Sequence, residues 1–126
     1  MKSGECYKYT DEPDDHLWIV LTDPSGGSGE VIVANVTTWR TSPKPDPACV
    51  LVQGDHAVIN HTSWVWYQAA QIHLDVAIEH AITLGQVKRQ GRLIEAAWSR
   101  VKKGAIDSDF LADDYKARVR ECHPDL

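Results

Sequence analysis

The first half of the chain has the hydrophobic pattern of short β-strands. Residues 17–21 form an unbroken apolar run, whose length suits a short strand buried on both faces better than a helix. Residues 31–37 are rich in β-branched side chains and predict a second strand. A proline and three glycines lie between the two segments, within residues 22–29, and predict a turn that joins them as a hairpin.

More short strands are expected further along this half. The sequence predicts strands at residues 49–52 and 62–67, with another at 70–74. Pro43, Pro45 and Pro47 exclude a helix or a central strand from the stretch that contains them, which is therefore expected to be a loop. Short strands at this spacing predict a small barrel or a sandwich.

The pattern changes from a period of 2 to a period of 3.6 after Asp75. Apolar positions then predict three short helices, near residues 78–84, 93–103 and 113–121. Gly104 is the expected end of the second helix, because glycine commonly terminates helices. The chain is thus expected to combine a β part with a helical part.

Length and composition fit one globular domain. The chain has 126 residues, of which 43% are hydrophobic and 25% charged, close to the averages for globular proteins. We therefore expect an α+β fold in a single domain, 1–126, with the β-barrel part at about 14–75 and the helical part at about 76–121.

The expected location is the cytoplasm, without contact with a membrane. No apolar run approaches the ~20 residues that span a bilayer, and the first residues lack the apolar stretch of a secretion signal. Three widely spaced cysteines, Cys6, Cys49 and Cys122, predict neither a disulfide framework nor a zinc site, so reduced thiols and no cofactor are expected.

The charge of the chain is unevenly distributed. The net charge is -5, and residues 1–60 hold 4 Lys or Arg against 9 Asp or Glu, whereas residues 61–126 hold 9 of each. Between positions 88 and 103 six basic residues accompany only Glu95, a local excess of five positive charges. This basic segment is suited to phosphates, or it is a solvated helix face whose cations favour the helix C-terminus.

Side chains suited to acid–base and phosphate chemistry occur at two predicted strand ends. His16 follows Asp14 and Asp15 directly before the first strand, and an imidazole can act as general acid or base because its reference pKa is ~6.5. After the second strand come four further candidates: Thr37, Thr38, Trp39 and Arg40. The hydroxyls and the guanidinium can bind a phosphate, and the indole can stack on a base.

A third group of candidates lies within residues 54–63, the densest polar segment of the chain. His56 and His61 could share proton transfer, with Asp55 orienting an imidazole and Ser63 contacting a substrate. With His16, these two histidines could instead hold a metal ion in a hydrolase. The metal interpretation is weaker, because a His-x4-His spacing is not typical of zinc sites.

Two common catalytic motifs are missing from the sequence. The glycine-rich segment 26–29 lacks the Gly-Lys-Ser/Thr ending of a P-loop and joins two predicted strands. No Gly-x-Ser-x-Gly nucleophile elbow occurs. The sequence therefore argues against P-loop nucleotide hydrolases and serine esterases.

Residues 17–22 and 31–38 resemble two strands of the MazF/PemK-like toxins, and residues 64–72 resemble a strand of that family and the segment containing Gln-Ile that follows it. The resemblance implies a small SH3-like β-barrel, here followed by two or three short helices, that cleaves single-stranded RNA. It also implies a protein antitoxin and a homodimer. The catalytic Thr or Ser of that family corresponds to Thr37, with Thr38 adjacent, whereas the family's arginine before the first strand is replaced by an acid and His16.

The sequence thus predicts a toxin-like RNA endonuclease that needs no metal ion. Cleavage requires a base for the ribose 2′-hydroxyl, an acid for the leaving oxygen and donors for the charged phosphate. His16 and either His56 or His61 are the candidates for proton transfer. Thr37 and Arg40 are the candidates for contact with the phosphate.

The alternative is a noncatalytic SH3-like module that binds protein or nucleic acid. Five tryptophans and four tyrosines are many for so short a chain, and aromatic side chains are enriched at interfaces. This interpretation expects Trp39 or Trp66 to lie exposed beside an apolar patch. The enzyme interpretation instead expects the histidines and Thr37 to share one pocket.

Overall fold

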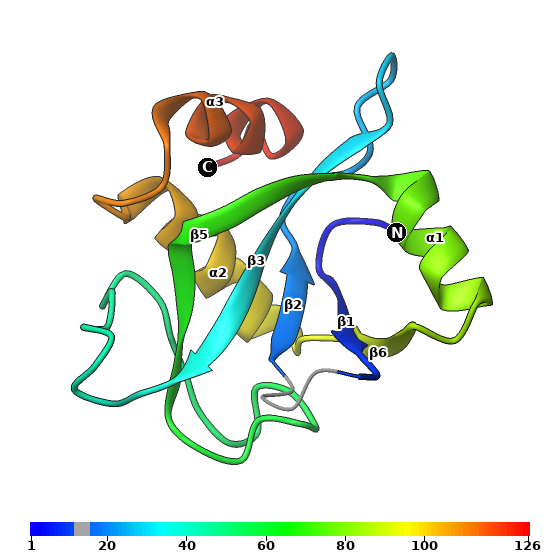
Figure 1. The fold of residues 1–126 in the computed structure, drawn as a ribbon. Helices are drawn as coiled ribbons and strands as arrows, with labels where there is room; N and C mark the ends of the chain where they lie inside the picture. Colours follow the sequence, from blue (N-terminus) through cyan, green and yellow to red (C-terminus); the bar gives the residue numbers. More distant parts are fainter. Residues whose placement is uncertain (12–15) are drawn as a thin grey trace.

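A curled antiparallel sheet organises the molecule (Figure 1). The computed structural model describes residues 1–11 and 16–126, and within these residues the sheet has six strands in the order β4-β5-β3-β2-β1-β6. The strands are β1 (Glu5–Tyr9), β2 (Leu17–Val20), β3 (Glu30–Thr38), β4 (Val50–Leu51), β5 (Ser63–Leu74) and β6 (Val87–Arg92). The helices are α1 (Asp75–Thr83), α2 (Glu95–Asp107) and α3 (Asp113–Cys122).

The central strand β3 is covered on both faces, which explains its continuous apolar sequence. Successive side chains point to opposite faces of a strand, so β3 contributes Ile32 to one core and Val33 to the other. The larger core lies between the sheet and α2, where Trp98 and Val101 are buried. The smaller core includes Trp18 and lies on the other face, against Ile78 of α1.

The predicted α+β fold class is confirmed, with the sheet curled into half a barrel and three helices in the described residues. The strands predicted at 62–67 and 70–74 are one continuous strand, β5. β1 and β6 were not expected from the sequence. Because β6 is an edge strand with mostly exposed polar side chains, it lacks the alternation of a half-buried strand. It pairs with β1, so the last strand of the sheet comes from the part of the chain that follows α1.

The cysteines in the structure are free, as expected. Burial raises the pKa of Cys6 to about 12 and that of Cys49 to about 11, so both thiols stay protonated at neutral pH. No helix in the described part of the chain is long and apolar enough to cross a membrane.

Gly104 lies inside α2, and the prediction that it ends the helix is wrong. The helix continues to Asp107 because Gly104 faces the sheet at a point of close approach rather than solvent. A Cβ at this position would lie 2.6 Å from the Tyr67 hydroxyl and 2.9 Å from the Ala48 carbonyl oxygen. The Tyr67 hydroxyl also donates a buried hydrogen bond of 2.7 Å to the Val101 carbonyl oxygen of α2. Gly104 therefore sets the distance between α2 and the sheet.

We expect Gly104→Ala to lower the free energy of unfolding by about 1–2 kcal/mol in urea denaturation. Forcing an extra methyl into a packed contact costs ~1–3 kcal/mol, which outweighs the gain of up to ~1 kcal/mol in helix propensity. Gly27→Ala is the control, because a Cβ there meets nothing within 4 Å. A Gly104→Ala variant as stable as the wild type would contradict the close approach.

Candidate functional site

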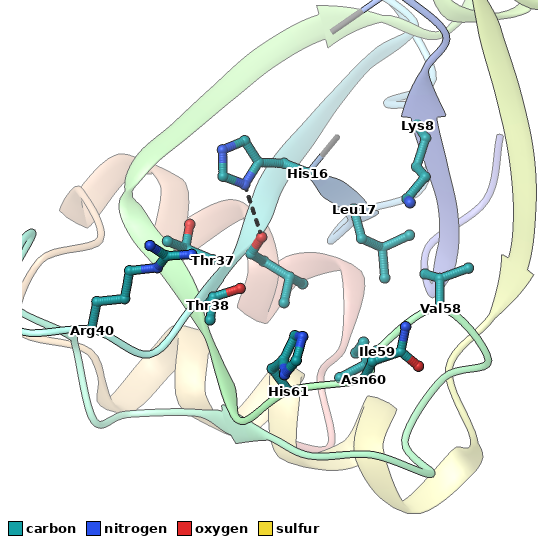
Figure 2. Close-up of a pocket in the computed structure, with 11 residues that line it drawn as sticks. Lys8, His16, Leu17, Thr37, Thr38, Arg40, Val58, Ile59, Asn60 and His61 are labelled. Carbon is teal, nitrogen blue, oxygen red and sulfur yellow. Dashed lines mark hydrogen bonds between the residues drawn. The ribbon is translucent and has the colours of Figure 1, made fainter. Parts of the chain in front are cut away.

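A pocket of about 330 Å³ opens where β2 begins and β3 ends (Figure 2). Its apolar lining comes from Leu17, Val36, Val58 and Ile59. Its polar lining consists of Lys8, His16, Thr37, Thr38, Arg40, Asn60 and His61. Residues from β1, β3 and the loop before β5 therefore meet at one end of the sheet. The volume of the pocket is typical of ligand-binding pockets.

His16 is held at this pocket by the pairing of β2 with β3. Leu17 pairs with Val36, so continuing the antiparallel register by one residue places His16 opposite Thr37. His16 Nδ1 lies 3.2 Å from the Val36 carbonyl oxygen. Because a carbonyl can only accept, Nδ1 carries the proton, and in the neutral ring Nε2 keeps its lone pair. His16 is thus oriented to accept a proton at Nε2.

Thr37 is nearly buried and uses its hydroxyl proton within the protein. Its Oγ1 donates to Asn35 Oδ1 at 2.9 Å, on the same face of β3. While this bond stands, the Thr37 oxygen can accept a hydrogen bond but has no proton to donate. Hydrogen bonds to an anion in the pocket must therefore be donated by neighbouring groups. The Thr38 hydroxyl and the Arg40 guanidinium both line the pocket and can donate them.

His61 stands across the pocket from His16, on the loop between β4 and β5 (Figure 2). Its side chain is exposed. Ser63 Oγ donates to the His61 carbonyl oxygen at 2.8 Å and so stabilises the turn that carries the imidazole. Ser63 is buried and does not line the pocket, so its contact is with the loop.

The described lining of the pocket includes two cationic side chains, although the protein is acidic overall. Lys8 and Arg40 contribute positive charges, and none of the lining residues in the described ranges is acidic. Figure 2 shows Arg40 extending into the pocket from the loop after β3. Such a lining favours an anionic ligand. Sequence reasoning missed Lys8, because β1 was not predicted, and did not single out Asn60 within the polar segment 54–63.

His56 and Asp55 are not part of the pocket. His56 is buried, and its Nε2 lies 2.7 Å from the Gln90 carbonyl oxygen while Nδ1 accepts from the Val58 amide at 3.1 Å. Asp55 accepts from Arg100 at 2.7 Å and from the Val52 amide at 2.8 Å, so it does not orient an imidazole. Both side chains hold the loop against β6 and α2.

The other candidate residues lie elsewhere. Trp39 is 44% exposed and does not line the pocket. Asp14 and Asp15 lie outside the described residues. In the basic segment, Arg89 pairs with Glu79 and Arg92 donates to the Ser3 carbonyl oxygen at 2.9 Å. The arginines of this segment thus stabilise the fold.

The geometry does not support a metal site made of His16, His56 and His61. The two ring nitrogens of His56 are both engaged by backbone groups, so no lone pair is left for a metal. No group of three His, Cys, Asp or Glu side chains in residues 1–11 and 16–126 is arranged to hold a metal ion.

Comparisons with known proteins show similarity at the level of the fold. No protein-family model matches the chain, and no curated protein matches it in sequence. A solved structure described as an endoribonuclease in complex with its cognate antitoxin, from mycobacterial species, aligns with a TM-score of 0.56 at 11% sequence identity. The alignment covers 85% of this chain and 92% of the other, so nearly the whole architecture is shared.

We expect His16 and His56 to adopt opposite neutral tautomers. Long-range ¹H–¹⁵N correlation spectra at pH ~8.5, well above the ordinary histidine pKa, distinguish the two forms. His16 should be protonated at Nδ1, and His56 at Nε2, as should His123, whose Nε2 lies 2.9 Å from the Leu21 carbonyl oxygen. His16→Gln assigns the signals. If the spectra show His16 protonated at Nε2, that nitrogen has no lone pair to accept a proton, and the orientation described above is wrong.

Proposed function

We propose that the protein is an endoribonuclease of the MazF/PemK-like toxin type, which cleaves single-stranded RNA without a metal ion. The observation that carries the proposal is that His16, with its Nε2 lone pair, and His61 line one pocket together with Arg40. The fold shared with a solved endoribonuclease supports it. The substrate is RNA rather than DNA, because the reaction uses the ribose 2′-hydroxyl as its nucleophile.

His16 is the general base of this proposal. Its Nε2 removes the proton of the 2′-hydroxyl, whose oxygen attacks the adjacent phosphorus, while the Val36 carbonyl holds Nδ1–H and stabilises the charged ring. His61, protonated, gives its proton to the departing 5′-oxygen. The products are a 2′,3′-cyclic phosphate and a 5′-hydroxyl, and no water or metal ion takes part in this step.

Arg40, Lys8 and Thr38 stabilise the negative charge that develops on the phosphate. Preorganised donors in a pocket contribute most when charge develops in the transition state. Thr37, which corresponds to the family's catalytic hydroxyl, holds Asn35 and accepts from the substrate. His16 stands where the family has arginine, so the positive charge comes from β1 and from the loop after β3 instead.

The partners of the proposal follow from the same resemblance. The similar solved structure is a complex with an antitoxin, and we infer that a protein antitoxin also binds this chain. A homodimer in the cytoplasm belongs to the same proposal. These inferences depend on the toxin assignment and are wrong if that assignment is wrong.

A noncatalytic binding module is the second candidate. Trp66 lines an apolar groove but is half-buried rather than exposed, whereas Trp39 is exposed but does not line that groove, so the expectation of this alternative is met only in part. His16, Thr37 and His61, however, share one pocket, which the alternative does not expect. The arrangement therefore favours the enzyme.

We expect His16→Ala and His61→Ala each to reduce cleavage of single-stranded RNA by about 10²–10⁴-fold, the usual contribution of general acid–base catalysis. The assay contains a chelator and follows the 2′,3′-cyclic phosphate ends over a broad set of sequences.

His80→Ala is the matched control, because His80 is an exposed histidine on α1 that does not line the pocket. It should cleave like the wild type. Intact RNA with the wild-type protein across all sequences would refute the function, and an equal loss in all three variants would refute the roles of the two histidines.

A further inference from the structure

A second groove lies beside the candidate site, along the strand β5. It has a volume of about 430 Å³. One wall is the proline-rich loop at residues 43–47, another is Phe110, and the strand β5 contributes Trp64, Trp66 and Gln68. Phe110 is 52% exposed, so much of its ring is accessible to a ligand in the groove.

The register of the sheet places the groove next to the candidate site. Thr37 pairs with Trp64, and Asn35 pairs with Trp66. Paired residues of neighbouring strands lie on the same face, ~5 Å apart, so the two tryptophans line the groove beside Thr37. The loop after β3 also reaches both sites, because Arg40 lines the pocket and Pro43 lines the groove.

The walls of the groove are held in place by buried hydrogen bonds. Ser108 Oγ donates to Asp46 at 2.6 Å, and both side chains are buried. The other Asp46 oxygen accepts from the Ala48 amide at 2.9 Å, and the Phe110 amide donates to Ser108 Oγ at 3.0 Å. The proline loop and Phe110 are therefore tied to one buried pair, and the groove is formed before any ligand arrives.

Trp66 is also positioned in advance. Its ring centroid lies 5.5 Å from that of Trp64, which is 1% exposed and fixed in the sheet. Such aromatic contacts restrict ring orientation. Part of the Trp66 ring remains accessible at the groove, and Gln68 and Lys44 provide an amide and a cation there.

We propose that this groove binds a nucleobase of single-stranded RNA, the one adjacent to the phosphate held at His16 and Arg40. The inference rests on the proposed function and adds a subsite to it. The base stacks on Trp66, a mode of binding that tolerates different bases because each has a π face. Gln68 contacts the edge of the base, and Lys44 contacts the backbone. Trp39, the stacking residue expected from sequence, lines neither site.

The test measures binding rather than cleavage. The probes are 2′-O-methyl octamers of uridine and of adenosine, labelled for fluorescence anisotropy, which cannot be cleaved because the 2′-hydroxyl is blocked. Trp66→Ala should raise Kd about 10-fold, since stacking contributes ~1–3 kcal/mol per base. Trp66→Phe should keep most of the affinity. Trp39→Ala is the control and should bind like the wild type, because Trp39 is exposed but outside the groove.

Phe110→Ala is a second variant. Because the Phe110 side chain is exposed, the variant should fold normally, and its Kd for the octamers should be several-fold higher. Thermal denaturation checks that each variant is folded. Unchanged affinity in Trp66→Ala and Phe110→Ala would overturn the subsite, as would a wild type that binds neither octamer. Light scattering adds one further outcome: loss of a dimer in Phe110→Ala would assign the groove to a second copy of the chain and overturn the proposal.

The subsite and the proposed function can fail separately. A wild-type protein that binds the octamers through Trp66 but cleaves no RNA refutes the endonuclease and leaves the base-binding groove. A Trp66→Ala variant that cleaves RNA with an unchanged KM refutes the groove and leaves the endonuclease.

Discussion

The antiparallel pairing of β3 with β5 is the constraint on which the other features depend. Its register places Val36 beside Val65 in the larger core and, one residue on, Thr37 beside Trp64 on the opposite face. Because side chains alternate along a strand, a slip of one residue would exchange these two sets. The same pairing therefore determines the core under α2 and the position of the aromatic groove.

The electrostatic character of the site differs from that of the whole chain. The net charge is -5, yet the described lining of the pocket is cationic and contains no acid. The basic segment 88–103 has the largest local excess of positive charge, but its arginines make contacts within the fold, such as Arg100 with Asp55. The side chains that line a pocket thus say more about its ligand than the charge summed along the sequence.

Much of the fold could be predicted from the sequence, and part of the site. The buried strands and the three helices have local hydrophobic periodicities, and these elements are present at the expected places. His16, Thr37, Thr38, Arg40 and His61 meet at the pocket, as their positions near strand ends indicated. His56 does not, because the contacts of its ring come from the backbone of Val58 and Gln90, and the latter is 34 residues away. Lys8 was missed together with its strand.

The sequence by itself determined most of the buried segments, such as β2, β3, β5 and α2, since hydrophobic periodicity is a property of neighbouring residues. It did not determine β6, whose polar residues become a strand only because β1 offers an edge to pair with. It also did not determine the tautomer of His16, which depends on the Val36 carbonyl oxygen, or the close approach at Gly104. Only the tertiary structure decided these features, because each depends on a contact between segments that are distant in the chain.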